Sequence, residues 1–263
     1  MALLFCALPF GAAAETVAAH HLQGTTHGYL TLKTEDGHIA AIGDLVQIVR
    51  GDRVTSHVTF HFKDGSLDEE TTVFSQRGNF ELISDHHVQK GPFFPHPVDM
   101  SIDTRSGDVT VKSPGKDGKD EVHTSHMKLP PDLYNGMIVP ITENLKTNAT
   151  EEDVSMLVAT PKPRLVKLAI SPKGDQSFSL AGVERKAQHY EIKIVLGGAA
   201  GVVAPLIGKQ PPNIQVWIEG GLVPGFVGEQ GQIAEDSPML SIQQTGPSMP
   251  AAQAGEPHTG TGN

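Results

Sequence analysis

The chain has 263 residues, a formal net charge of −10 at pH 7 and a hydrophobic fraction of 38%. This negative charge, with Lys and Arg scattered along the chain, argues against binding to nucleic acid or to an anionic lipid surface, because both would repel the protein. After the N-terminus, no run approaches the roughly 18 apolar residues of a membrane-spanning helix. We therefore expect no integral membrane span and no nucleic-acid partner.

Residues 1–14 carry no charge and predict a secretory signal peptide. The apolar run ends in Ala12-Ala13-Ala14, small residues that are typical of a cleavage site before Glu15. The alternative is an apolar N-terminus that is buried or disordered. Export to the periplasm or the extracellular space is the expectation, with residues 15–26 as a mobile leader. The single cysteine, Cys6, would leave with the signal, so the mature chain would have no disulfide and no Cys-based zinc site.

Short sequences typical of turns recur through the next hundred residues. Asp36-Gly37, Asp64-Gly65 and Gly78-Asn79 separate runs rich in Val, Ile, Thr and Phe, and such pairs supply the positive φ angles of tight hairpins. The clearest strand covers residues 54–63, where apolar and polar side chains alternate. The pattern predicts an all-β, mainly antiparallel fold: a curved meander forming a barrel or half-barrel, as one domain over residues 27–243.

A helical insertion is predicted at residues 130–146. Two prolines precede Asp132, and Gly136 and Pro140 inside the segment indicate a kink or two short pieces. Four apolar residues recur at four-residue spacing, as on one face of an amphipathic helix: Leu133, Met137, Ile141 and Leu145. Such a helix could plug the concave face of a half-barrel or pack outside the sheet as a crossover, and both placements remain open.

A second β segment follows the helix. Its strands are expected at residues 154–160, 164–171, 178–181, 188–196 and 214–219. Beyond Gln243, Gly, Pro, Gln and Thr dominate, so residues 244–263 are predicted to be a disordered tail.

Histidines and acidic residues offer few catalytic or metal-binding patterns. Asp85 and His87 lie two residues apart and are expected on one strand face, but there is no HExxH motif and no Cys pair, so neither a zinc site nor another cofactor is predicted. Glu69 and Glu70 lie beside a turn and are interpreted as solvated rather than as a catalytic pair. No G-x-S-x-G motif occurs either, and an enzymatic role is therefore not favoured.

The densest group of polar and aromatic residues lies at residues 84–97. In a strand predicted over residues 80–90, His86 is expected on the same face as the apolar side chains, pointing inward. The proline-rich turn that follows presents Phe93 and Phe94. An inward imidazole beside aromatic rings resembles the polar group of an apolar ligand pocket. The alternative is a rigid corner that caps the core, with His86 hydrogen-bonded to a backbone carbonyl.

Val216-Trp217-Ile218-Glu219-Gly220-Gly221, followed by Pro224 and Phe226, resembles a pattern in uncharacterised exported bacterial β-proteins. A similar strand pair closes the half-barrels of periplasmic lipoprotein carriers. The first β segment, with Phe60-His61-Phe62 and Gln89-Lys90-Gly91-Pro92, also resembles exported proteins with no assigned activity. The resemblance implies a curved β architecture with an apolar interior, and it transfers no catalytic residue.

The sequence therefore predicts a non-enzymatic exported envelope protein that binds an apolar ligand, such as a lipid, or an apolar partner segment on its concave face. Three alternatives stay open: a secreted hydrolase, a histidine-based metal-binding protein, and a structural or interaction module with a filled core. The expected wall and rim residues are Phe60, Phe62, His86, Phe93, Phe94, Met137, Ile141 and Trp217.

Overall fold

A computed structural model of the chain describes residues 16–115, 119–145, 150–160, 162–180, 182–195 and 211–246. They form one antiparallel sheet of 14 strands and one short helix. The predicted all-β, antiparallel meander with a short helical insertion is thus confirmed. The predicted signal peptide and residues 247–263 of the predicted tail lie outside the described residues.

The elements follow a simple order along the chain. The first eight strands are β1 (Thr26–Thr34), β2 (Ile39–Arg50), β3 (Arg53–Phe62), β4 (Leu67–Ser75), β5 (Glu81–Lys90), β6 (Val98–Asp103), β7 (Asp108–Pro114) and β8 (Asp120–His126). They are followed by α1 (Ile138–Thr142), β9 (Glu152–Val158), β10 (Arg164–Leu180), β11 (Val183–Val195), β12 (Ile214–Glu219), β13 (Gly225–Gly231) and β14 (Leu240–Thr245). Short turns join most neighbours, and Gly37 and Gly65 adopt positive φ angles of 84° and 86° in two of them.

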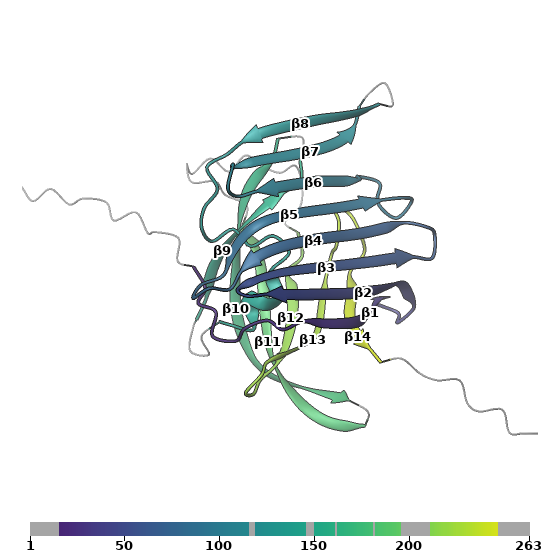
Figure 1. The fold of residues 1–263 in the computed structure, drawn as a ribbon. Coiled ribbons are helices and arrows are strands. Elements are labelled where there is room, and N and C mark those ends of the chain that lie inside the picture. The colour runs from purple at the N-terminus through teal and green to yellow at the C-terminus, as the bar shows by residue number, and fades with distance from the viewer. Residues whose placement is uncertain are drawn as a thin grey trace, which may run out of the picture.

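The sheet consists of two meanders joined at one seam. Its strand order is β8-β7-β6-β5-β4-β3-β2-β1-β14-β13-β12-β11-β10-β9. Among the described strands, only β1 and β14 pair without being neighbours along the chain. We call β1–β8 the first leaf and β9–β14 the second leaf. Figure 1 shows the second leaf behind the first, with the strands of the two leaves crossing steeply. Because β8 and β9 end the strand order, the sheet is curved but not closed.

Residues 130–145, here called the plug segment, pack between the leaves at one end of the interior. Met137 and Ile141 are fully buried in a core cluster that also contains Phe74 of β4 and Ile170 of β10. Of the two placements that the sequence left open, the plug is the one observed.

Within the helical insertion predicted over residues 130–146, α1 is the one helical piece among the described residues, so the helix is shorter than the four-residue spacing indicated. The chain before α1 instead lies along the free edge of β9. Leu133 forms a parallel bridge with Ser155, and the backbone N–H of Tyr134 donates to the carbonyl of Ser155 at 2.9 Å. Gly136 then turns the chain with a φ of 66°, which is outside the right-handed helical region. These backbone bonds to β9 replace those of the first helical turns.

The segment expected to be a mobile leader lies against the first leaf. Val17 is buried, and its N–H donates to the hydroxyl of Tyr134 in the plug segment at 2.9 Å. The N–H of Phe80 donates to the carbonyl of Val17 at 2.9 Å. Residues 16–25 therefore belong to the packed domain.

The second leaf differs from its predicted strands in two places. Two separate strands were expected at residues 164–171 and 178–181, whereas β10 is one strand of 17 residues. The predicted tail begins inside β14, which extends the sheet to Thr245. Among the described residues, no helix reaches the length and apolar character that crossing a bilayer requires.

Candidate functional site

Polar side chains cross the inner face of the first leaf in three adjacent rows. An apolar row of Val54, Phe74 and Leu82 precedes them on β3, β4 and β5. The next three rows, in register across the same strands, are Ser56–Thr72–Asp85, Val58–Glu70–His87 and Phe60–Asp68–Gln89. We call Asp68, Glu70, Thr72, Asp85, His87 and Gln89, together with Glu229 of β13, the interior polar network.

A β-bulge at Ile83 decides which histidine faces inward. The register between β4 and β5 shifts there and leaves Ile83 without a partner, so the inward and outward alternation reverses after it. Leu82 and His87 both face the interior as a result. The expectation that His86 points inward is wrong, because its side chain is 52% exposed and its Nε2 lies 3.0 Å from Asp99 Oδ1.

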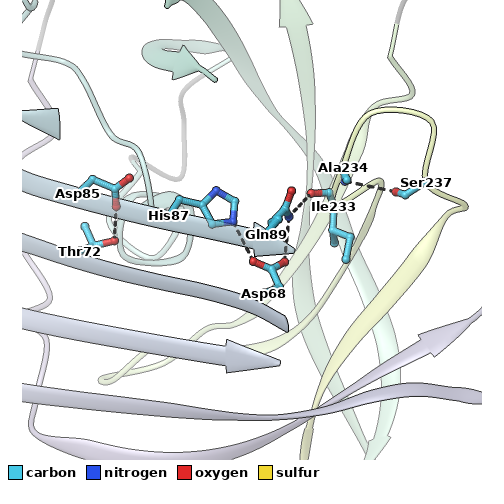
Figure 2. A network of polar contacts seen from close by, with 8 residues as sticks. All are labelled: Asp68, Thr72, Asp85, His87, Gln89, Ile233, Ala234 and Ser237. Carbon is cyan, nitrogen blue, oxygen red and sulfur yellow. Dashed lines mark hydrogen bonds and ion pairs between the residues drawn. The ribbon is translucent and has the colours of Figure 1, made fainter. Parts of the chain in front are cut away.

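At the end formed by Asp68 and Gln89, which we call its outer end, the interior polar network connects the two leaves. His87 Nε2 hydrogen-bonds Asp68 Oδ1 at 2.8 Å, and Gln89 Nε2 donates to Asp68 Oδ2 at 3.0 Å. Gln89 Nε2 also donates to the carbonyl of Ile233 at 2.8 Å. Ile233 belongs to the loop between β13 and β14, residues 232–239, which we call the strap. Figure 2 shows this chain of contacts running from β4 and β5 to the strap.

At its inner end, the network meets the plug segment. The hydroxyl of Thr72 donates to Asp85 Oδ1 at 2.9 Å. The other oxygen, Asp85 Oδ2, is buried and has no hydrogen-bond partner among the described residues. Gly136 lies against this pair so closely that a Cβ atom there would stand 1.9 Å from Thr72 Oγ1. The inner end is therefore closed by backbone, and only glycine fits.

Burial changes the protonation of the network. Burial, and then the charge of Glu70, raise the pKa of Asp85 to about 8. Burial also raises the pKa of Glu70 and brings the pKa of Glu229 to about 7. Although burial alone lowers the pKa of His87, its hydrogen bond to Asp68 and the neighbouring carboxylates raise that pKa to about 9. At neutral pH the interior therefore favours the protonated form of Asp85 beside a charged His87 imidazole.

The four phenylalanines that were predicted as wall and rim residues come together beside the network. The ring centroids of Phe62 and Phe93 lie 4.5 Å apart, and those of Phe93 and Phe94 lie 5.2 Å apart. Phe60 belongs to the same apolar cluster and is paired with Asp68 across β3 and β4. Aromatic and acidic groups therefore adjoin one another on one inner face.

The remaining predicted residues lie elsewhere. Met137 and Ile141 belong to the plug at the other end of the interior. Trp217 alternates with the buried Val216 and Ile218 on β12, so its side chain lies on the outer face of the second leaf. The expectation that Trp217 lines the concave face is wrong.

Several residues of the network were not predicted. Asp85 and His87 share a face, as their spacing indicated, but Glu70 was expected to be solvated with Glu69 and instead faces the interior. The signal was available in β4, where Asp68, Glu70 and Thr72 alternate in phase with the buried Phe74. No local pattern identifies Glu229, because it reaches the network from the opposite leaf.

Two further searches bear on the site. Within the described ranges, no group of three or more His, Cys, Asp or Glu side chains is placed to hold a metal ion. Comparisons with protein-family models, curated proteins and solved structures find nothing that matches this chain. The resemblance to exported β-proteins and lipoprotein carriers therefore stays an expectation from the sequence, and function is argued from the geometry.

Proposed function

We propose that this protein is a non-enzymatic exported binding protein that takes an apolar ligand carrying a cationic group into the space between its two leaves. The phenylalanine cluster binds the apolar part, and the interior polar network binds the cation. The observation that carries the proposal is the buried Asp85 Oδ2, which has no hydrogen-bond partner among the described residues and lies in a region rich in carboxyl groups.

The balance of charge in the network favours a cation. The network contains four carboxyl groups, those of Asp68, Glu70, Asp85 and Glu229, and one imidazole, that of His87; Asp68, Glu70 and Asp85 act on the imidazole, and Glu229 acts on Glu70. A buried carboxyl group without a partner destabilises the fold, whereas a positive charge placed among such groups is stabilised by all of them. An ammonium group would give Asp85 Oδ2 a partner and lower the raised pKa values. A ligand carboxylate would instead add to the repulsion.

The exposure of the network indicates where a ligand would enter. Asp85 is 2% exposed, whereas the side chains of Asp68 and His87 are 12% and 25% exposed. Accessibility therefore increases toward the strap. Among the described residues, Gln89 makes the side-chain hydrogen bond that ties the strap to the first leaf. The apolar cluster includes Ile233 and Ala234 of the strap, so movement of the strap would uncover the phenylalanines and the acids together.

Isothermal titration calorimetry tests the proposal. The purified protein is titrated with a long-chain alkylamine and with the fatty acid of equal chain length, in two buffers of different ionisation enthalpy. We expect near-stoichiometric binding of the amine with release of protons at neutral pH, because the bound cation deprotonates groups whose pKa is raised. Affinity for the amine should increase from about pH 6 to about pH 8. The fatty acid should bind more weakly.

Matched variants locate the binding site. Asp85→Asn can still accept the hydrogen bond of Thr72 but cannot become charged, so it should weaken amine binding by about tenfold. Asp99→Asn changes a carboxylate on the outer face of the same leaf and should bind the amine as the unmodified protein does. Equal affinity for amine and fatty acid, or full amine affinity in Asp85→Asn, would contradict the proposal. Binding of neither would favour a structural module with a filled core.

A further inference from the structure

The outer face of the second leaf carries a cavity that lies apart from the interior polar network. This cavity, of about 270 Å³, is lined by residues of β10, β12, β13 and β14. In the sheet, β11 and β12 separate β10 from β13, so residues 176–178 reach the cavity only because the long β10–β11 hairpin curves. Figure 1 shows this hairpin extending past the ends of its neighbours and bending beneath them. The cavity therefore lies between the hairpin and the outer face of the sheet.

Trp217 forms a rigid aromatic wall of this cavity. Its ring is stacked on the ring of His189, with centroids 5.0 Å apart and planes inclined by 10°. Its Nε1–H donates to Gln176 Oε1 at 2.7 Å, and His189 Nε2 hydrogen-bonds Gln215 Oε1 at 2.7 Å. Its cross-strand partner on the other side is Gly228, which has no side chain. One face of the indole is thus held by His189, and the face toward β13 is not covered by its partner.

Five residues that line the cavity carry uncharged amide or hydroxyl groups: Gln176, Ser177, Gln230, Ser241 and Gln243. Within the part of the chain that the structure describes, the side chains of Ser177, Gln230 and Ser241 make no hydrogen bond and so remain able to bind a ligand. Gln243 Oε1 accepts a hydrogen bond from Lys33 Nζ at 3.0 Å, which leaves the amide NH₂ of Gln243 as a donor. Hydroxyl groups and amides of this kind can both donate and accept hydrogen bonds.

Among the described residues that line the cavity, Glu229 is the one that carries a carboxyl group. This residue, however, pairs with the buried Val216 and with Ile242, and its side chain belongs to the interior row. A ligand in the cavity therefore meets an aromatic face, hydroxyl groups and amides. This composition does not favour an ionic ligand.

We propose that this outer cavity is a binding site for a neutral carbohydrate. The apolar C–H face of a pyranose ring stacks on the uncovered face of Trp217, and the ring hydroxyls exchange hydrogen bonds with the serines and glutamines. The volume is close to the lower end of small-ligand pockets, which begin at about 300 Å³, and suits a short stretch of sugar units. The site is separate from the interior polar network and does not depend on the function proposed for it.

The chain contains one tryptophan, so its intrinsic fluorescence reports directly on the cavity. The full protein is titrated with neutral cello-, chito- and manno-oligosaccharides, and with oligogalacturonate as a charged comparison. We expect a saturable change in Trp217 fluorescence with at least one neutral series and no saturable change with oligogalacturonate. Absence of saturable binding by every neutral series would overturn the proposal, and so would preference for the charged series.

Three variants establish where the sugar binds. Gln230→Ala removes a free amide and should weaken binding by several-fold, about 1 kcal/mol for one hydrogen bond. Gly228→Val places a side chain over the uncovered indole face and should weaken binding by about tenfold or more. Because a Cβ atom there would lie 3.2 Å from the carbonyl oxygen of Ile242, its folding is checked by circular dichroism. Tyr29→Ala removes an exposed aromatic ring outside the cavity and should leave binding unchanged. Unchanged affinity in folded Gln230→Ala and Gly228→Val would overturn the assignment.

Discussion

The plug segment and the interior polar network both place polar groups between the leaves, but an acid of the network, Asp85, lacks the partners that the acid of the plug has. Asp132 in the plug is fully buried, and it accepts hydrogen bonds from Ser155 Oγ at 3.0 Å and from Lys167 Nζ at 2.7 Å. Asp85 in the network is almost as buried, yet it accepts one bond, from Thr72, and its second oxygen has no partner among the described residues. The same chemical group is therefore structural in one place and unsatisfied in the other.

Other buried polar groups of the plug follow the pattern of Asp132. The Asn135 side chain accepts from the N–H of Leu157 and donates to its carbonyl, both at 2.9 Å. Asn144 donates to the carbonyl oxygens of Pro140 and His21. This interior can evidently satisfy its polar groups where their role is to hold the fold. The unsatisfied Asp85 oxygen next to the plug is therefore an exception in this interior, and the cationic ligand that we propose would give it a partner.

The largest loss of stability is expected at Gly136, where the plug segment contacts the interior polar network. Gly136→Ala places a Cβ atom 1.9 Å from Thr72 Oγ1 at a φ of 66°, so it combines a clash with backbone strain and should lower the free energy of unfolding by about 3–5 kcal/mol. Gly37→Ala is the matched control, because its φ is 84° and nothing lies within 4 Å of the new Cβ. The control should lose only about 1 kcal/mol. Urea unfolding measures both, and equal losses would show that the plug does not press on the network.

A smaller loss of stability is expected when the hydrogen-bonded acid of the plug, Asp132, is replaced. Asp132→Asn removes the ion pair with Lys167 while Ser155 keeps an acceptor, and it should lower the free energy of unfolding by about 2–3 kcal/mol at neutral pH. Asp99→Asn, in an exposed pair with His86, should change it by less than about 1 kcal/mol. If Asp132→Asn were as mild as Asp99→Asn in urea unfolding, the contrast between the two regions would disappear.

The unsatisfied acid, Asp85, should lower the stability of the folded protein when it is charged, whereas the charged Asp132 raises it. The effect of Asp85 should therefore depend on pH. The folded protein binds a proton at Asp85 with a pKa of about 8, against 3.8 for an ordinary aspartate. The contribution of this proton to the free energy of unfolding is therefore fully present below about pH 4, and it is lost as pH rises through about 8. His87, with its pKa raised to about 9 from 6.5, adds a loss in the same direction at higher pH. The unmodified protein should lose stability steadily from about pH 5 to about pH 9.

Asp85→Asn removes the Asp85 part of this pH dependence. At about pH 9 the variant should be more stable than the unmodified protein by about 3–4 kcal/mol, and at about pH 5 the two should agree within about 0.5 kcal/mol. Thermal unfolding across this range measures the difference. A variant that is destabilised equally at both pH values would identify Asp85 as a structural acid like Asp132.

The meander could be predicted because its signals are local. Asp36-Gly37 and Asp64-Gly65 set two hairpins in adjacent residues, and the alternation within β3 defines its buried face without any knowledge of distant strands. The non-helical course of the plug segment before α1 could not be predicted in this way. The four-residue spacing of Leu133 and Met137 carries no information on the competing hydrogen bonds that β9 offers.

The candidate site was only partly accessible from the sequence. The bulge at Ile83 moves the inward position from His86 to His87, and a bulge has no reliable local pattern. The position of Trp217, by contrast, followed from its buried neighbours Val216 and Ile218, so that error was avoidable. Glu229 joins the network through the folding of one leaf over the other, which only the tertiary structure shows.

The seam between β1 and β14 also has a consequence for how the chain folds. Each leaf can assemble from neighbouring hairpins as soon as its own strands are available, but the contact of Lys33 with Gln243 spans 210 residues. Contacts of such sequence separation form slowly, because a long loop must close first. During synthesis from the N-terminus, β1 therefore presents an open edge until the last strand arrives. This edge is where a chaperone would protect the nascent chain and where aggregation would begin.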